Sequence, residues 1–261
     1  LFQFFRQNFV AGSKFTGVVT RRRDGQRSDG GYQRDEVKDQ APRAILSCYP
    51  SKLPDESLLD AMRAVLRGGR DIDRRTADSL FHFVLASTDS KAASIFIEAV
   101  QLEWAIEHLL SPKSGRKEFA KRVTAALAGY PSELASDSSR PKGEFSDKAA
   151  QEGCPIIREW ANEFYLLRNK ITHGDDLTTY QWRWDVGEHC IFSAWLYPLL
   201  VKLLLAENGD YVLTDDDRAS LESTGKLLST EDWGEKWSRV LNDQRSSVRI
   251  RKVQEKHHDS R

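Results

Sequence analysis

Cysteine and long apolar runs are scarce in this sequence, and each scarcity argues against a class of protein. The three cysteines among 261 residues, Cys48, Cys154 and Cys190, are widely spaced and odd in number, which argues against a disulfide framework and a cysteine-based metal site. No apolar run reaches the ~18 residues that a membrane-spanning helix requires, because Pro198 and Lys202 interrupt the longest one. We therefore expect a cytoplasmic protein with buried thiols, no metal or other cofactor, and no membrane partner.

An excess of charge of either sign is also missing. The chain carries 39 basic and 39 acidic residues, so its formal net charge is zero. Proteins that coat nucleic acid usually carry a clear basic excess, because attraction to phosphates drives their binding. The balance argues against a DNA-coating role, but it is compatible with a nuclease that holds a few phosphates locally.

The N-terminal segment has little apolar surface to bury. Residues 21–43, RRRDGQRSDGGYQRDEVKDQAPR, are charged and glycine-rich, and such a composition cannot offset the entropy that folding removes. The preceding stretch, LFQFFRQNFV, has an arginine in its middle and is not typical of a secretory signal. We predict that residues 1–53 are poorly ordered or non-native and that residues 242–261 form a polar tail.

Helical periodicity begins after residue 53. Apolar residues recur at three- and four-residue steps, which is typical of helices that bury one face. No strand-like alternation competes, apart from a short extended piece at 178–184, and a polar loop is expected at 132–150. We therefore predict an all-α protein with one domain at 54–241, a helical bundle of five to six main helices with flexible terminal segments. The long predicted helices cover 55–69, 73–88, 90–110, 115–130, 155–174 and 185–209, and two shorter ones cover 214–228 and 230–241.

One predicted helix end gathers polar side chains that can perform chemistry. The segment YLLRNKITHGDD, residues 165–176, places Arg168, Asn169 and His173 in the last turns of a largely apolar helix, directly before Gly174. Asn169 and His173 are four residues apart and share a face, whereas Arg168 lies about 100° to one side of Asn169. The unpaired carbonyl groups of a last helical turn favour a protonated imidazole at His173.

These residue types meet the needs of metal-free RNA cleavage. A base takes the proton of the ribose 2′-hydroxyl, which attacks the adjacent phosphorus, and an acid protonates the leaving 5′-oxygen. His173 suits the proton transfer, and Arg168 suits the neutralisation of charge on the phosphoryl oxygens. One histidine per chain is few for both base and acid, so two chains facing each other would be an economical arrangement. The structural alternative is that Arg168 pairs with an acid and His173 caps the helix.

The segment LLRNKITHG resembles the signature of the HEPN superfamily of helical-bundle ribonucleases, an arginine and a polar residue followed by a histidine. Arg168, Asn169 and His173 match that signature position by position, and a glycine such as Gly174 is frequent after the histidine. Upstream, AVQLEWAIEHLL is similar to the acidic helix of the Apea-like branch, with Glu103 as the matching residue, and RKEFAKRVTAAL resembles the next helix of that branch. The resemblance covers about residues 90–205.

This resemblance implies a metal-independent RNA endonuclease that uses 2′-hydroxyl attack and leaves cyclic phosphate ends. It implies a homodimer whose two Arg/His motifs meet in one cleft, in a bacterial defence or toxin setting, with RNA as substrate and an antitoxin or regulatory protein as a further partner. Some members are inactive, so a non-catalytic helical module that binds a protein or nucleotide is the alternative. Asn169 is of the kind found in active members, and we therefore expect Arg168, Asn169, His173 and Glu103 to form the catalytic site.

The role of the acidic residue stays open between two interpretations. Glu103 is expected either to hold Arg168 or orient His173, or to be a partly buried acid that pairs with some other cation. Glu98 and Glu107 lie about four residues to either side in the same helix, so the matching acid depends on the register of that helix.

Four other features each allow a functional and a structural interpretation. The segment YQWRW, residues 180–184, could stack on unpaired RNA bases, but we favour packing that seals a loop against the bundle. The segment RGGRDIDRR, residues 67–75, could hold phosphate, but its aspartates favour a solvated turn between helices. His82 and His189 are interpreted as core or surface histidines and not as metal ligands. Tyr165 is the hydroxyl aromatic nearest the motif, at which a nucleotidyl modification would block the site.

Overall fold

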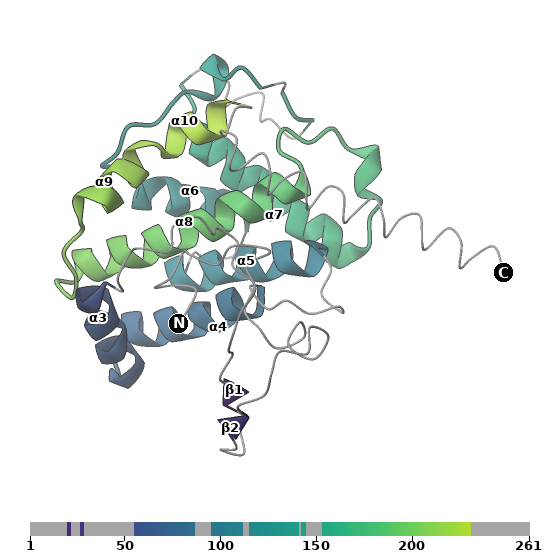
Figure 1. Cartoon of the computed structure of the whole chain (residues 1–261). Helices are drawn as coiled ribbons and strands as arrows, with labels where there is room; N and C mark the ends of the chain where they lie inside the picture. Colours follow the sequence, from purple (N-terminus) through teal and green to yellow (C-terminus); the bar gives the residue numbers. More distant parts are fainter. Residues whose placement is uncertain are drawn as a thin grey trace.

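The computed structural model describes residues 55–86, 95–111, 115–140, 142–144 and 153–230, together with the short strands β1 (Thr20–Arg21) and β2 (Arg27–Ser28). These two strands pair in antiparallel fashion and were not predicted. In the part of the chain that is described, the fold is the predicted all-α bundle (Figure 1). Cys48, the predicted helix at 230–241 beyond Thr230, and the predicted polar tail lie outside the described residues.

Long helices dominate the bundle. Six helices of 11 to 22 residues in the described ranges agree with the five to six main helices predicted. The predicted helix at 214–228 is in fact two short helices that meet at Ser223. The elements are α3 (Glu56–Arg67), α4 (Asp71–Ala86), α5 (Ile95–Leu110), α6 (Arg116–Ala126), η1 (Ala135–Asp137), α7 (Ile156–His173), η3 (Leu177–Thr179), α8 (Val186–Glu207), α9 (Asp215–Glu222) and α10 (Thr224–Ser229).

Side-chain caps determine where several helices begin and end. The Asp55 carboxylate accepts a hydrogen bond from the backbone of α3, and Asp185 with Glu188 forms a capping box at the start of α8. α7 ends where Gly174 adopts a φ of 74°, a left-handed conformation that costs glycine little. Each cap pairs backbone groups that a helix end would otherwise leave unsatisfied, which is why the predicted limits at these positions are close to the observed ones.

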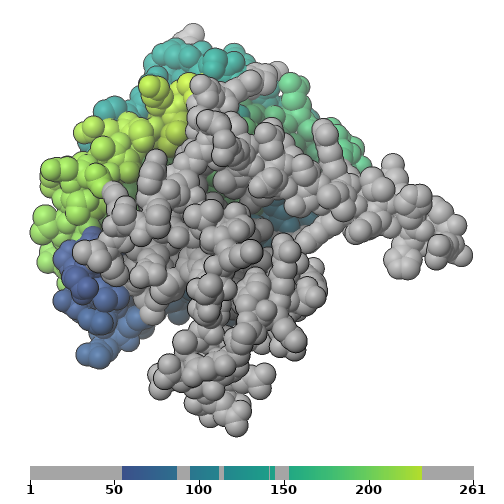
Figure 2. Space-filling view, viewed as in Figure 1, coloured from purple at the N-terminus to yellow at the C-terminus, as the bar shows by residue number. Residues whose placement is uncertain are grey.

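α5 lies at the centre of the bundle. It packs against α4 and α8 and also contacts α7, which in turn packs along α6. Figure 1 shows α4, α5 and α8 side by side, and Figure 2 shows α3, α9 and α10 along one edge of the molecule in the same view. Large side chains from α6, α7, α8 and the loop before α8 fill the core, each less than 2% exposed: Phe119, Trp160, Phe164, Trp184, Phe192 and Tyr197.

α8 is the most apolar helix, and it is buried as predicted. By length and composition alone it could cross a membrane, yet 78% of its most apolar window is buried inside the bundle. The core helix of a soluble protein passes the same test, so this helix is weak evidence for a membrane span. Cys190 of α8 and Cys154 before α7 are both buried, in agreement with the prediction for cysteine.

Two connecting segments differ from the predictions. The predicted extended piece at 178–184 begins instead with η3, stabilised by a hydrogen bond from the Thr178 backbone to the Asp176 carboxylate, and its described residues form no strand. The turn at 67–75 is not simply solvated, because Asp73 is 1% exposed. Asp73 accepts hydrogen bonds from the backbone and the guanidinium of Arg70, so α4 starts at Asp71, earlier than predicted.

A sealed polar cluster attaches the loop before α8 to α7. The buried carboxylate of Glu163 accepts hydrogen bonds from the backbone N–H groups of Arg183 and Trp184 and from Nε2 of His189, at 2.9 to 3.2 Å. Gly143 lies against this cluster, since a Cβ there would be 2.6 Å from Oε2 of Glu163. These contacts connect three separate parts of the chain through one carboxylate.

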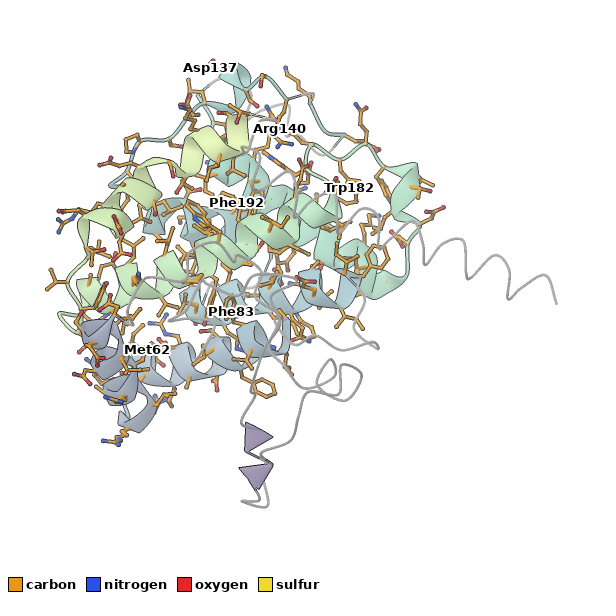
Figure 3. All side chains as sticks on the ribbon, viewed as in Figure 1. Met62, Phe83, Asp137, Arg140, Trp182 and Phe192 are labelled. Carbon is orange, nitrogen blue, oxygen red and sulfur yellow. The ribbon has the colours of Figure 1, made fainter. Side chains whose placement is uncertain are left out.

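The YQWRW segment packs as the structural interpretation predicted. Nη1 of Arg183 donates to Glu159 at 2.7 Å, and the indole N–H of Trp184 donates to the Leu228 carbonyl at 3.2 Å. Trp184 is fully buried, so it has no face to offer an RNA base. Figure 3 shows Arg140 and Trp182 in the upper part of the view, and Met62 of α3 at the lower left.

Candidate active site

The structure brings Arg168, Asn169 and Glu103 together where α7 passes α5. Nε and Nη2 of Arg168 donate to the Glu103 carboxylate at 2.9 and 3.3 Å, and Nη1 donates to Oδ1 of Asn169 at 2.8 Å. The pairing with Glu103 is a two-pronged contact of the kind that orients a guanidinium strongly. Three of the four predicted site residues thus form one cluster.

The acidic side of the cluster contains one residue that the sequence reasoning did not assign. Nη2 of Arg168 also donates to Glu107 at 3.2 Å. Glu103 and Glu107 are four residues apart and therefore share a face of α5, from which both accept hydrogen bonds from Arg168 of α7. The spacing of four residues between Glu103 and Glu107 was the sequence signal that could have identified Glu107 as a second partner of Arg168. The contact also agrees with the structural alternative, in which Arg168 pairs with acids.

Burial differs across the cluster. The Glu103 side chain is fully buried, while those of Arg168 and Glu107 are 15% and 25% exposed. Burial raises the pKa of Glu103 to about 8 from an ordinary value of 4.5, and the neighbouring Arg168 charge opposes part of that rise. Burial acts to lower the pKa of Arg168, but the two carboxylates outweigh it and raise that pKa, so the guanidinium stays charged.

An aromatic ring fixes the guanidinium from another side. Cζ of Arg168 lies 4.3 Å from the centroid of the Tyr165 ring, within the range of a cation–π interaction. Phe119 of α6 contacts the same ring, with centroids 5.7 Å apart. The half-buried Tyr165 therefore joins the Arg168 cluster to the packing of α6 on α7.

His173 occupies the last turn of α7, as predicted, and is exposed. It lies four residues beyond Asn169, so those two side chains share a face. It lies five residues beyond Arg168, which is a rotation of about 140° around the helix axis. Within the described ranges His173 makes no hydrogen bond to Arg168 or Glu103. One chain therefore directs the imidazole and the guanidinium to different sides.

Lys170 fastens the loop that follows His173. Its Nζ donates to the Asp175 carboxylate at 2.7 Å and to the Tyr180 hydroxyl at 2.8 Å. The hydrogen bond with Asp175 raises the pKa of Lys170, and the same bond is the main cause that lowers the pKa of Asp175, with a smaller contribution from His173. The loop is thus held against α7 beside the exposed imidazole.

His82 and His189 are a surface and a core residue, as expected. Nδ1 of His82 is 2.8 Å from the Gln101 side chain, and its ring lies beside Trp104 and His108 on the outside of α4 and α5. His189 is fully buried against Phe164. In the part of the chain that the structure describes, no group of three or more His, Cys, Asp or Glu side chains could hold a metal ion.

Comparison of this chain with models of protein families, with curated proteins and with solved structures found no match. The resemblance to the HEPN superfamily is therefore carried by residues of this chain alone, Glu103 and the segment 168–174. It stays a prediction about family and activity.

Proposed function

We propose that this chain is a metal-independent RNA endonuclease of HEPN type. One observation supports the proposal most: Arg168 donates to Asn169, and Asn169 shares a helix face with the exposed His173. The last turns of α7 thus carry a permanent cation held in one orientation, an amide that binds it, and an imidazole open to solvent on the amide's face. These are the groups needed to neutralise phosphoryl oxygens and to move a proton at the ribose.

The roles follow from the chemistry of the two groups. An imidazole of His173 takes the proton of a ribose 2′-hydroxyl, and the 2′-oxygen forms a bond to the adjacent phosphorus. The bond from phosphorus to the 5′-oxygen breaks, and that oxygen receives a proton from a second, protonated imidazole. The products are a 2′,3′-cyclic phosphate and a 5′-hydroxyl, while Arg168 balances the charge on the non-bridging oxygens.

Two copies of the chain would complete this site. Because Arg168 and His173 diverge by about 140° around α7, one chain does not aim both side chains at a single phosphate. In a two-fold pair, the guanidinium of one copy and the imidazole of the other can face the same phosphate. The same arrangement supplies the second imidazole that the proton transfers require.

A non-catalytic helical module is the second candidate, and one observation favours it. Glu103 and Glu107 both accept hydrogen bonds from Arg168, so the guanidinium is already paired within the chain. In that case the cluster would be an ion-pair network that fastens α7 to α5, and a protein or nucleotide partner would bind at another surface.

The bacterial defence or toxin setting is proposed from the resemblance alone. An RNase of this class slows growth when it is expressed without a neutralising partner. We therefore expect expression of the chain in bacteria to slow growth and the His173→Ala variant to relieve that effect. Equal growth of the two strains would contradict a toxic role.

The experiment that tests the proposal is cleavage of a single-stranded RNA by the purified chain in excess chelator. Cleavage is expected to persist and to leave 2′,3′-cyclic phosphate ends. Loss of activity in chelator would contradict the proposal. Adding an excess of His173→Ala chain to the wild type and letting pairs re-form should lower the activity below that of the same amount of wild type alone, because a mixed pair has one imidazole where the proton transfers require two. Activity that excess His173→Ala chain leaves unchanged would remove the two-copy site.

A further inference from the structure

The Arg168 cluster contains more acidic than basic groups. One guanidinium donates to two carboxylates, those of Glu103 and Glu107. An RNA phosphate at the same guanidinium would lie beside the Glu107 carboxylate, and anions repel one another strongly at contact distance. The arrangement seen in the free chain therefore disfavours a phosphate, unless one carboxylate leaves.

Glu107 is the carboxylate that can leave. Glu103 is fully buried and receives both Nε and Nη2 of Arg168, so its release would strand a buried group without its partner. Glu107 is 25% exposed and receives one hydrogen bond, from Nη2 at 3.2 Å. When the Glu107 side chain turns outward, water can donate hydrogen bonds to its carboxylate in place of Arg168. The release of Glu107 therefore costs far less free energy than the release of Glu103.

The departure of Glu107 would open the outer edge of the guanidinium. Nη2 then has an N–H group free, and Nη1 has two N–H groups of which Asn169 uses one. Two neighbouring N–H groups on one edge match two oxygens of a phosphate. Tyr165 and Glu103 continue to hold the guanidinium in place during the exchange.

The charge on the cluster supports the same exchange. Burial raises the pKa of Glu103 to about 8, so near neutral pH the carboxylate of Glu107 is the main balance to the Arg168 charge. Once Glu107 turns away, the guanidinium presents a net positive charge to the incoming ligand.

We propose that Glu107 occupies the phosphate-binding edge of Arg168 in the free chain and that an RNA phosphate displaces it. The inference rests on the proposed function, because it takes the ligand to be RNA. Glu107 is then a competing anion at the site, which lowers the affinity for RNA and takes no part in bond breaking.

The test is the binding of a labelled, non-cleavable 2′-O-methyl oligonucleotide, followed by fluorescence anisotropy at low salt. Glu107→Gln should bind about two- to fivefold more tightly than the wild type, since a partly exposed ion pair is worth up to about 1 kcal/mol. Glu222→Gln is the matched control, because it removes the same charge from an exposed position on α9. Adding Arg168→Ala to Glu107→Gln should abolish the gain.

The outcomes separate this inference from the proposed function. A Glu107→Gln chain that binds no more tightly than Glu222→Gln, or a gain that survives Arg168→Ala, overturns the inference even if RNA is cleaved. If the wild type leaves RNA intact while the Arg168-dependent gain is observed, the inference stands and the nuclease proposal fails. Glu107→Ala provides the same comparison should the glutamine variant fail to fold.

Discussion

The two halves of α7 hold arginine–carboxylate pairs of the same chemistry in opposite surroundings. In the N-terminal half, Glu163 and Glu159 bind the backbone and guanidinium of Arg183, whose side chain is 2% exposed. In the C-terminal half, Arg168 meets the buried Glu103 and the partly exposed Glu107 at the rim of the bundle. One helix thus carries a closed polar cluster and an open one.

This difference in burial determines which of the two clusters can exchange one of its partners. Breaking a buried pair costs about 3–5 kcal/mol, because the remaining charge has neither water nor a partner. A pair at the rim contributes only about 0–1 kcal/mol, because water replaces whichever partner leaves. The closed cluster is therefore suited to fasten loops, and the open cluster is suited to bind a ligand.

The largest effect, on the rate of RNA cleavage, is expected from a substitution in the C-terminal half of α7, which carries the open cluster. If the proposed nuclease mechanism holds, His173→Ala should lower RNA cleavage by about 10²- to 10⁴-fold, because the proposal assigns the proton transfer to this imidazole. Its melting temperature should stay close to that of the wild type, since the side chain is exposed. His108→Ala, which removes an exposed histidine from α5, is the control for both measurements and should keep full activity. A His173→Ala chain that still cleaves RNA would contradict the catalytic role proposed for the open end of α7.

The pH dependence of stability should reveal the buried acid of the open cluster. The pKa of Glu103 is raised from 4.5 to about 8 in the folded chain, so the folded state binds its proton more tightly than the unfolded state does. The stability from this group is fully present below pH 4.5 and is lost as the pH rises through about 8. Relative to Glu103→Gln, the wild type should lose no more than about 5 kcal/mol over this window, since one pKa unit is worth about 1.4 kcal/mol.

Denaturant unfolding of the two chains at several pH values measures this loss directly. The quantity to compare is the slope of the free energy of unfolding with pH. The absolute free energy is not compared, because Glu103→Gln also weakens the pairing with Arg168. Parallel slopes for the two chains would show that Glu103 is ionised in the folded state at neutral pH.

A substitution in the closed cluster should change the stability of the fold and not the chemistry of the candidate site. Glu163→Ala leaves the backbone N–H groups of Arg183 and Trp184 without a partner inside the fold. The free energy of unfolding should fall by about 3–5 kcal/mol, as for other broken buried networks. Urea denaturation measures the loss, and Glu207→Ala, an exposed residue at the end of α8, should lose little. A stable Glu163→Ala chain would show that the cluster is not sealed.

The smallest of these effects is expected at Gly143. A Cβ at this position would lie 2.6 Å from Oε2 of Glu163 and 2.9 Å from the backbone nitrogen of Arg183. Gly143→Ala should therefore lower stability by about 1–3 kcal/mol, the usual cost of overpacking. Gly129→Ala is the control, since nothing lies within 4 Å of a Cβ there. Equal melting temperatures for the two variants would contradict the close approach.

Much of the fold could be read from local patterns. Apolar residues at helical spacing predicted α3 to α8, and the predicted limits lie close to the caps at Asp55, Thr214 and Gly174, because capping involves neighbours in the chain. The differences have two causes. The turn before α4 depends on Asp73, whose buried carboxylate accepts a hydrogen bond from Arg70 three residues earlier, and the sequence pattern did not show that burial. Residues 178–184 are held by distant contacts with Glu163 of α7 and the Leu228 carbonyl of α10.

The sequence by itself determined the identity of the site residues: an arginine, an amide and a histidine at a helix end, with a glutamate upstream. Only the tertiary structure decided that Glu103 and Glu107 both reach Arg168 and that His173 is exposed while Arg168 is mostly buried. The physical reason is the separation along the chain over which each interaction acts. Helix periodicity and capping act between residues a few positions apart, whereas charge pairing and burial depend on how α5 and α7 pack, which no local pattern encodes.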